Sequence, residues 1–345
     1  MKINKHIEIV RCGISKLSSM GLKSCNMLQS ELSKTYSRVE ISYVSNEADL
    51  DRLIAKKPDL AFLGFKQLMS DDKEALWICE KLDEQGISYT GSSKEAMLMD
   101  HNKDIAKDKI IECGLLTASF FMASPSQFKN SDDLPIKFPL FIKPPKEGGG
   151  TGIDDKSIVR DFRSFEDKVK QIDSVFGTPA LVESYLDGRE FSVAILETLG
   201  EEETLVMPIE LIAEANAFGD KLLSRKVKSE DTEHAIIVSD LVLREKITKL
   251  ALSCYKALGA RDYGRIDIRM DHKGDLHFLE ANLIPGVANH DFISYFNSAC
   301  ILNEEIHYSE MINMIVSLGI ARSFSLDDDD ILLEEPMSVL QPVYL

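Results

Sequence analysis

The chain has 345 residues and a formal net charge of −17 at pH 7, and its length accommodates two or three compact domains. The acidic excess disfavours nucleic acid and anionic membrane surfaces as partners. No apolar run approaches the ~20 residues that a membrane span requires, and the first residues lack the apolar core of a signal peptide. Six cysteines are scattered without a Cys-x-x-Cys pair, which predicts a cytoplasmic protein with reduced thiols and no zinc site.

The first ninety residues alternate between apolar runs and helical patterns. We expect strands at residues 7–10, 39–44, 60–63 and 87–89, and helices at residues 20–32, 48–55 and 73–84. This alternation predicts a doubly wound parallel sheet, and such sheets bind ligands at the carboxyl ends of their strands. The turn at residues 12–15 is therefore a candidate substrate lip, although a plain connecting loop fits equally well.

A glycine-rich loop follows in the middle of the chain. A helix is expected at residues 94–113 and strands at 119–122 and 140–143, and the loop PPKEGGGTG at residues 144–152 comes next. Glycine lets backbone N–H groups approach a phosphate closely, and Lys143 at the end of the strand would add a positive charge. The loop lacks the Gly-Lys-Ser/Thr of a P-loop, and a flexible surface loop is the alternative.

Two glutamates flank a turn further along the chain. Strands are expected at residues 180–186 and 190–196, with a turn at 187–189 between them. Glu183 and Glu190 border this turn, where they would accept hydrogen bonds from an adenine amino group and ribose hydroxyls. Ordinary exposed carboxylates are the alternative interpretation.

The remaining segments are a loop, two helices and a tail. Residues 216–231 have no strong periodicity and are interpreted as a mobile active-site loop or a plain solvent loop. Amphipathic helices are expected at 240–258 and 308–318. The tail after Arg322 is acidic and then apolar at 331–333, so it would dock on the body, dock on a partner or be disordered.

The strongest pattern is a pair of strands, YGRIDIR at residues 263–269 and LHFLEAN at residues 276–282, joined by a turn-forming cluster. Side chains alternate between the two faces of a strand. If the strands pair in register, one face gathers a guanidinium, two carboxylates and an amide: Arg265, Asp267, Glu280 and Asn282. Oxygen ligands of this kind suit Mg²⁺, and the apolar flanks argue against a merely solvated face because buried carboxylates need partners.

Taken in order, these elements resemble the ATP-grasp superfamily, and in particular the D-alanine–D-alanine ligases, from about residue 7 to about residue 320. The resemblance rests on an ordered set of motifs: ISYTGS at 87–92, Lys143 with its glycine-rich loop, Glu183 followed by GREFSVA at 188–194, GRID at 264–267, and LEAN at 279–282 followed by Pro285 and Gly286.

The resemblance implies a fold and a division of the chain. It implies an α/β domain with a doubly wound parallel sheet at residues 1–95, then a two-lobed ATP-grasp fold with a small α+β lobe at 96–186 and a large lobe with the Mg-ATP site at 187–322, and finally a tail at 323–345. It also suggests a homodimer formed through the first domain.

The resemblance also implies a reaction and a set of site residues. ATP phosphorylates a carboxylate, and an amine then attacks the acyl phosphate to give an amide, ADP and phosphate. The implied ATP contacts are Lys103, Lys143, Gly149, Gly150, Glu183, Tyr185, Leu186 and Glu190. Asp267, Glu280 and Asn282 would hold two Mg²⁺ ions, with Mn²⁺ as an alternative. Arg265 and the N–H of Gly286 would stabilise the tetrahedral oxyanion.

The substrate anchors of the family are changed. The glutamate that holds the amine of the first D-alanine is matched by Leu17, which follows Ser15 in the early turn. The serine that binds the acceptor carboxylate is matched by Asp291, which would repel a carboxylate. The tyrosine-rich closing loop is replaced by a segment that contains Lys226. We therefore assign substrate contacts to Ser15, Leu17, Lys226 and Asp291.

The resulting hypothesis is a carboxylate–amine ligase acting on an amino acid or small peptide other than D-alanine. An authentic D-alanine–D-alanine ligase with divergent anchors is one alternative. A catalytically idle nucleotide-binding partner protein is an alternative of another class, and a phosphotransferase that stops after phosphorylation is a third.

Overall fold

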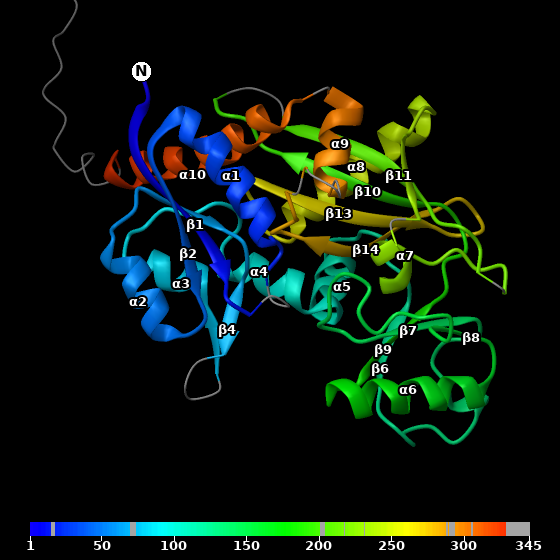
Figure 1. Cartoon of the computed structure of the whole chain (residues 1–345). Coiled ribbons are helices and arrows are strands. Elements are labelled where there is room, and N and C mark those ends of the chain that lie inside the picture. Colours follow the sequence, from blue (N-terminus) through cyan, green and yellow to red (C-terminus); the bar gives the residue numbers. More distant parts are fainter. Residues whose placement is uncertain are drawn as a thin grey trace, which may run out of the picture.

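The computed structural model describes residues 1–14, 18–69, 74–200, 204–216, 218–230, 232–287, 289, 294–304 and 306–328. Figure 1 shows three main sheets: one in the blue amino-terminal part, a small one at the lower right and a large one above it. Within the described residues, no helix is long and apolar enough to cross a membrane.

The amino-terminal sheet is parallel, as the alternating pattern predicted. Its order is β2-β1-β3, with β1 (Ile3–Cys12) between β2 (Tyr36–Val44) and β3 (Leu60–Leu63). The connecting helices are α1 (Leu22–Thr35) and α2 (Glu47–Ala55). Ile7 and Val10 of β1 are fully buried, because a parallel sheet is covered on both faces.

Two of the predicted amino-terminal elements are wrong. The helix expected at 73–84 is replaced by a short hairpin of β4 (Gln67–Met69) and β5 (Ala75–Trp77), after which α3 covers only Ile78–Asp83. The strand expected at 87–89 is a single bridge between Ala61 and Tyr89.

The helix expected at 94–113 is also two helices, α4 (Lys94–His101) and α5 (Lys103–Glu112). Asn102 interrupts them with an extended backbone and donates a side-chain hydrogen bond to the carbonyl of Leu98. This break makes Lys103 the first residue of α5.

The small sheet is antiparallel in the order β6-β9-β7-β8. Its strands are β6 (Phe120–Ala123), β7 (Leu140–Lys143), β8 (Ile158–Val159) and β9 (Ala180–Ser184), and a 3₁₀ turn, η1 (Ser131–Asp133), lies between β6 and β7. Helix α6 (Phe162–Phe176) packs on this sheet through Phe165 and Val169 and ends at Gly177, which has a left-handed conformation.

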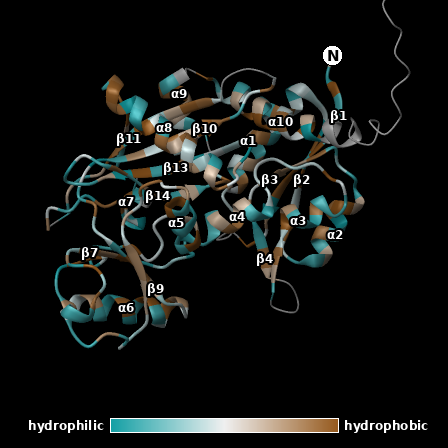
Figure 2. Cartoon of the chain, turned by 180° about the vertical axis from the view of Figure 1, so that it is seen from behind, coloured by the Kyte–Doolittle hydropathy of each residue, from teal (hydrophilic) through white to brown (hydrophobic). Residues whose placement is uncertain are grey.

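The large sheet is antiparallel in the order β12-β11-β10-β13-β14. Its strands are β10 (Glu190–Leu196), β11 (Leu205–Ile212), β12 (His234–Ile237), β13 (Tyr263–Met270) and β14 (Leu276–Asn282). Alternation along β10 buries Val193 against α8 (Leu241–Ala257) and Ala194 on the side of α9 (Tyr295–Glu304). The two helices therefore cover opposite faces, and hydrophobic residues concentrate in the sheets between them (Figure 2).

Two helices lie in segments with weaker sequence signals. Helix α7 (Arg225–Glu230) forms within the region interpreted as an irregular loop. Helix α10 (Tyr308–Asp328) runs ten residues beyond the expected end at 318 and enters the segment interpreted as a tail. Residues 329–345 lie outside the described part of the chain. The domain boundaries near 95, 186 and 322 stay predictions.

A buried carboxylate joins the amino-terminal part to the large sheet. Asp262 precedes β13 with a positive φ of 64°, is 3% exposed and accepts a 2.7 Å hydrogen bond from the backbone N–H of Gly91. Its other oxygen pairs with Arg322 of α10. This contact ties the start of β13, and with it the site described next, to the first sheet.

Candidate active site

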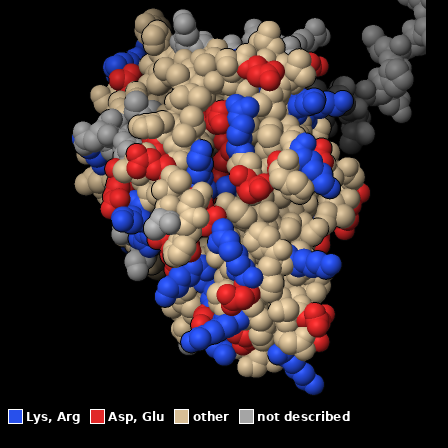
Figure 3. Space-filling model, turned by 90° about the vertical axis from the view of Figure 1, so that its right-hand side faces the viewer, with Lys and Arg blue, Asp and Glu red and all other residues tan. Residues whose placement is uncertain are grey.

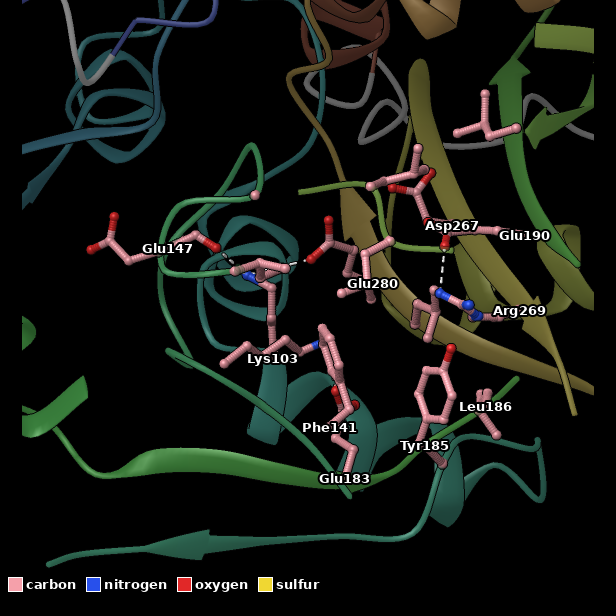
Figure 4. Close-up of a pocket in the computed structure, with 18 of the residues that line it drawn as sticks. Lys103, Phe141, Glu147, Glu183, Tyr185, Leu186, Glu190, Asp267, Arg269 and Glu280 are labelled. Carbon is pink, nitrogen blue, oxygen red and sulfur yellow. Dashed lines mark hydrogen bonds and ion pairs between the residues drawn. The ribbon is translucent and has the colours of Figure 1, made fainter. Parts of the chain in front are cut away.

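The β13–β14 hairpin brings four polar side chains together, as the sequence predicted. Arg265 lies opposite Asn282 and Asp267 lies opposite Glu280, with a register shift directly after Asp267. Residues directly opposite each other in an antiparallel pair point to the same face. The acidic pair therefore projects from the middle of the hairpin into a pocket between the two lobes, where Figure 4 shows both carboxylates.

Asp267 is enclosed by hydrogen-bond donors. The Nε and one terminal nitrogen of Arg265 each lie 2.9 Å from a different oxygen of this carboxylate. The hydroxyl of Ser192 donates to Oδ1 at 2.7 Å, and the amide of Asn282 lies 3.4 Å from Oδ2. A bidentate arginine of this kind fixes the carboxylate geometrically as well as electrostatically.

Glu280 faces the cations of the pocket. Its Oε2 lies 3.5 Å from the Nζ of Lys103. Burial alone would raise the pKa of Glu280, but the nearby Lys103, Lys143 and Lys228 outweigh it and lower this pKa to about 2. The side chain is therefore an anionic oxygen ligand throughout the physiological pH range.

Two lysines form the cationic end of the pocket. Lys103, at the start of α5, is 6% exposed and donates to the carbonyl of Glu147 in the glycine-rich loop at 2.6 Å. Lys143, at the end of β7, is 5% exposed and lies 2.8 Å from Oε2 of Glu183. Burial lowers the pKa of Lys103. Figure 4 shows Lys103 between Glu147 and Glu280.

Glu183 is less available than the sequence suggested. It is 2% exposed, and its Oε1 lies 2.6 Å from the Nζ of Lys107 while Oε2 pairs with Lys143. The sequence did not predict a role for Lys107, on α5, because its position in a helical pattern is the same as that of an ordinary exposed lysine. A contact between Glu183 and adenine stays a prediction, and it would involve an oxygen already shared with a lysine.

Part of the pocket wall is apolar. It combines an aromatic and several aliphatic side chains from both lobes: Phe141, Leu186, Leu211, Leu222, Leu223 and Leu279. Tyr185 and Leu186, just after β9, lie at the junction between the lobes and line this wall. Apolar side chains next to cationic ones are the combination that a base with attached phosphates requires.

Glu190 begins β10 and faces Arg269 of β13. The two residues pair across the strands, and Nη1 of Arg269 lies 2.9 Å from Oε2 of Glu190. Burial raises the pKa of Glu190, and Arg269 opposes this rise. In the sequence, Arg269 belongs to the YGRIDIR strand, but the pattern gave it no role.

The glycine-rich loop covers the pocket through Gly150. Gly149 and Gly150 both have positive φ, 62° and 78°, but only Gly150 lines the pocket. A β-carbon on Gly150 would lie 2.8 Å from the backbone nitrogen of Arg225. The loop therefore packs backbone to backbone against the start of α7.

Of the four predicted substrate residues, one does not line the pocket and three lie outside the described part of the chain. Lys226 is exposed and is not among the pocket-lining residues, whereas Lys228, two residues further along α7, lines the pocket and lies 5.7 Å from the ring of Tyr295. Residues two apart on a helix point in different directions, so a helix assignment would have revealed this. Ser15, Leu17 and Asp291 lie outside the described residues.

Gly286 follows β14 by four residues and lies close to the early loop. A β-carbon there would approach the carbonyl oxygen of Ser19 to 3.3 Å. This close approach brings the end of the hairpin region next to the segment that carries the predicted substrate lip.

The face around the lobes carries both signs of charge. On the described residues that Figure 3 displays, Lys and Arg side chains are intermingled with Asp and Glu. A polyanion-binding surface would instead gather positive charge over a broad area.

Fold and site together define an ATP-grasp ligase, an enzyme that forms C–N bonds. The family model described as "D-ala D-ala ligase C-terminus" matches residues 111–317. The chain belongs to this family.

Relatives and solved structures agree with this assignment. A D-alanine–D-alanine ligase of Hydrogenovibrio crunogenus is 27% identical over 266 residues, covering 77% of this chain and 79% of the relative. An uncharacterized protein of Sinorhizobium fredii, y4sG, is 31% identical over 251 residues, covering 70% of this chain and 69% of the relative. A Bacillus anthracis D-alanine–D-alanine ligase structure complexed with ATP matches with a TM-score of 0.70 and 23% identity, covering 93% of this chain and 99% of that one, which shows the shared fold.

Proposed function

We propose that the protein is an ATP-dependent ligase that joins a small carboxylic acid to an amine through an acyl phosphate. The observation that carries this proposal is the arrangement of Glu280 and Asp267 across one pocket from the buried Lys103 and Lys143. Acidic oxygen ligands facing lysines suit a metal-bound polyphosphate, because both kinds of group are needed to hold and neutralise it.

We propose one orientation for ATP in this pocket. The apolar wall at Phe141, Leu186 and Leu279 would hold the adenine. Lys103 and Lys143 would bind the phosphates, with the backbone at Gly149 and Gly150 over them. The Bacillus anthracis ligase that shares the fold is complexed with ATP, which supports ATP as the nucleotide.

The donor set fits Mg²⁺. Asp267, Glu280 and Asn282 offer carboxylate and amide oxygens, which are the ligands this ion prefers, and the low pKa of Glu280 keeps its charge available. We propose two Mg²⁺ ions, with Mn²⁺ as a substitute. When bound, these ions neutralise charge between the phosphates and the incoming carboxylate.

The proposed reaction has two steps. A carboxylate oxygen of the acid attacks the γ-phosphorus and ADP leaves, forming the acyl phosphate. The amine then attacks the acyl carbon, phosphate leaves, and the amine proton passes to solvent. Arg265, held in place by Asp267, and the N–H of Gly286 would stabilise the oxyanion of the tetrahedral intermediate, where each such donor contributes about 3 kcal/mol.

The acid and amine are proposed to differ from D-alanine. Leucine at position 17 cannot hold an ammonium group, and a carboxylate at position 291 would repel an acceptor carboxylate and attract a cationic group. An authentic D-alanine–D-alanine ligase is the alternative that the named relatives support. A nucleotide-binding protein without ligase activity is the alternative of another class.

ADP release across a panel of amino acids, peptides and amines tests the proposal. We expect turnover with an acid–amine pair other than D-alanine and transfer of carboxylate oxygen-18 into phosphate. Robust turnover with D-alanine alone would contradict the substrate assignment. ATP binding without turnover on any pair would favour the idle nucleotide-binding protein.

A reciprocal variant sharpens the substrate test. The double substitution Leu17→Glu and Asp291→Ser restores the two anchors that the D-alanine ligases carry, so it should gain activity on D-alanine. Arg265→Met in the same background serves as the inactive control. Failure to gain activity, with ATP binding intact, would mean that positions 17 and 291 do not select the substrate.

We also propose a homodimer formed through residues 1–95, as the resemblance suggests. Light scattering should give twice the mass of the chain, and the monomer mass would contradict the proposal.

A further inference from the structure

Arg269 lies inside the proposed nucleotide pocket without an assigned role. It is on β13, two residues after Asp267, and is 7% exposed. It lines the pocket together with Glu190 and Tyr185. In Figure 4 its guanidinium lies between the ring of Tyr185 and the carboxylate of Glu190.

The guanidinium contacts three separate segments. Nη1 donates to Oε2 of Glu190 at 2.9 Å, and Nη2 donates to the backbone carbonyl of Lys221, in the loop between β11 and α7, also at 2.9 Å. The guanidinium carbon lies 5.5 Å from the centre of the Tyr185 ring. Because the donors of arginine form a rigid planar fork, one side chain can fix the relative positions of all three segments.

One donor of Arg269 has no partner among the described residues. Its Nε is buried and forms no hydrogen bond with any of them. An unsatisfied buried donor is costly, so the two hydrogen bonds that the guanidinium makes to Glu190 and Lys221 have to offset this cost.

The Glu190–Arg269 pair lies where the ribose of a bound nucleotide would be expected. Glu190 pairs with Arg269 across the strands and Ser192 pairs with Asp267, so the ion pair lies two residues from the acidic hairpin. That offset corresponds to about 7 Å along a strand. On the other side are Tyr185 and Leu186 of the apolar wall. A ribose joins a base to its phosphates, and it would occupy this intermediate place.

We propose that Arg269 is a positioning residue that orients Glu190 and the loop at Lys221 around the nucleotide ribose and thereby makes the enzyme select ribonucleotides. The inference rests on the proposed ATP binding and deepens it. The side chain does not act on the transferred phosphate. It holds the carboxylate that meets the sugar hydroxyls and closes the loop beside it.

The test is nucleotide binding measured by calorimetry, using ADP, 2′-deoxy-ADP and 3′-deoxy-ADP in Mg²⁺-containing buffer. Hydrogen bonds to charged groups are worth enough to give the native protein a roughly 10- to 100-fold preference for ADP over at least one deoxy form. In Arg269→Met the preference should fall to within about threefold, mainly through weaker ADP binding, because Glu190 loses its partner.

Arg189→Met is the matched control. Arg189 forms a similar arginine–glutamate pair with Glu210, 2.8 Å from Nε to Oε1, but its side chain is 44% exposed and is not among the residues that line the nucleotide pocket. This variant should keep the native preference.

The outcomes separate the inference from the function on which it rests. An unchanged preference in Arg269→Met, with ADP binding intact, would overturn the inference and leave the ligase proposal standing. A native protein that binds no ADP would overturn both. If Arg269→Met does not fold, Arg269→Lys replaces it. Lysine lacks the planar fork whose two separate nitrogens reach Glu190 and Lys221, so a reduced preference supports the role of the fork and a native preference overturns it.

Discussion

Lys107 illustrates how a single buried charge shapes the pocket. Its ammonium is fully buried, lies 2.6 Å from Glu183 and donates to Thr117 at 2.7 Å. Burial lowers the pKa of Lys107. The side chain is not among the residues that line the pocket, yet it pairs with the carboxylate of Glu183, which does line it.

Lys107→Met should destabilise the fold by about 3 kcal/mol, because removing one member of a buried ion pair leaves the other poorly compensated. Urea unfolding gives the free energy. Lys109→Met is the control on the same helix, since Lys109 forms an exposed pair with Glu112 and its loss should change stability by less than about 0.5 kcal/mol. Equal effects of the two substitutions would contradict this account.

Glu280 should give the stability of the protein a distinct acid dependence. Its pKa is about 2 in the folded protein and 4.5 in the reference state, so its ionised form stabilises the fold above the unfolded pKa. This contribution is lost as the pH falls towards 2 and is at most of the order of 3 kcal/mol. The difference in unfolding free energy between the native protein and Glu280→Gln, measured without metal from pH 7 to pH 2.5, should therefore shrink at acid pH. A difference independent of pH would contradict the assignment.

The glycine-rich loop packs closely against the start of α7. Gly150 has both a positive φ and no space for a β-carbon against the backbone of Arg225. Gly150→Ala should push the loop away from α7 and displace the backbone that is proposed to bind the phosphates. A displacement of about 1 Å in such a site can cost roughly 10²-fold in kcat/KM.

Gly177→Ala is the control for Gly150→Ala. Gly177 also has a positive φ, 64°, but a β-carbon added there would meet nothing within 4 Å, and the residue ends α6 away from the pocket. The substitution should cost about 1 kcal/mol of stability and leave kcat/KM unchanged. A loss of kcat/KM in Gly177→Ala as large as in Gly150→Ala would point to general destabilisation.

Strong local patterns made much of this architecture predictable. The β13–β14 hairpin, the parallel order of the first sheet and the position of Lys143 follow from alternation, turn residues and apolar runs. The break at Asn102 was missed because helical periodicity continues on both sides of it. The burial of Lys107 and the role of Arg269 depend on partners more than seventy residues away in the chain, which no local pattern can show.

The amino-terminal sheet and the ligase lobes are joined at Asp262, which binds Gly91 and Arg322. Asp262→Ala should lower the free energy of unfolding by about 3 kcal/mol, because it leaves the buried N–H of Gly91 without its acceptor and removes the carboxylate that pairs with Arg322. Chemical unfolding measures the effect. Asp51→Ala, at an exposed position on α2, should change it by less than about 0.5 kcal/mol, and a comparable loss there would argue against the junction.

The eight residues of β13 also fix the spacing between the side chains of the proposed site. Tyr263 follows the junction, and Arg265, Asp267 and Arg269 lie on one face of the strand. That face carries the proposed contacts to the reacting groups and to the sugar. The span from Arg265 to Arg269 is about 13 Å at the usual rise per residue, so the strand would fix the spacing of the proposed contacts along a bound nucleotide. Deleting one residue within β13 would turn every later side chain of the strand to the other face. The turn at residues 271–275, in contrast, can change in length without moving Arg265, Asp267 or Arg269.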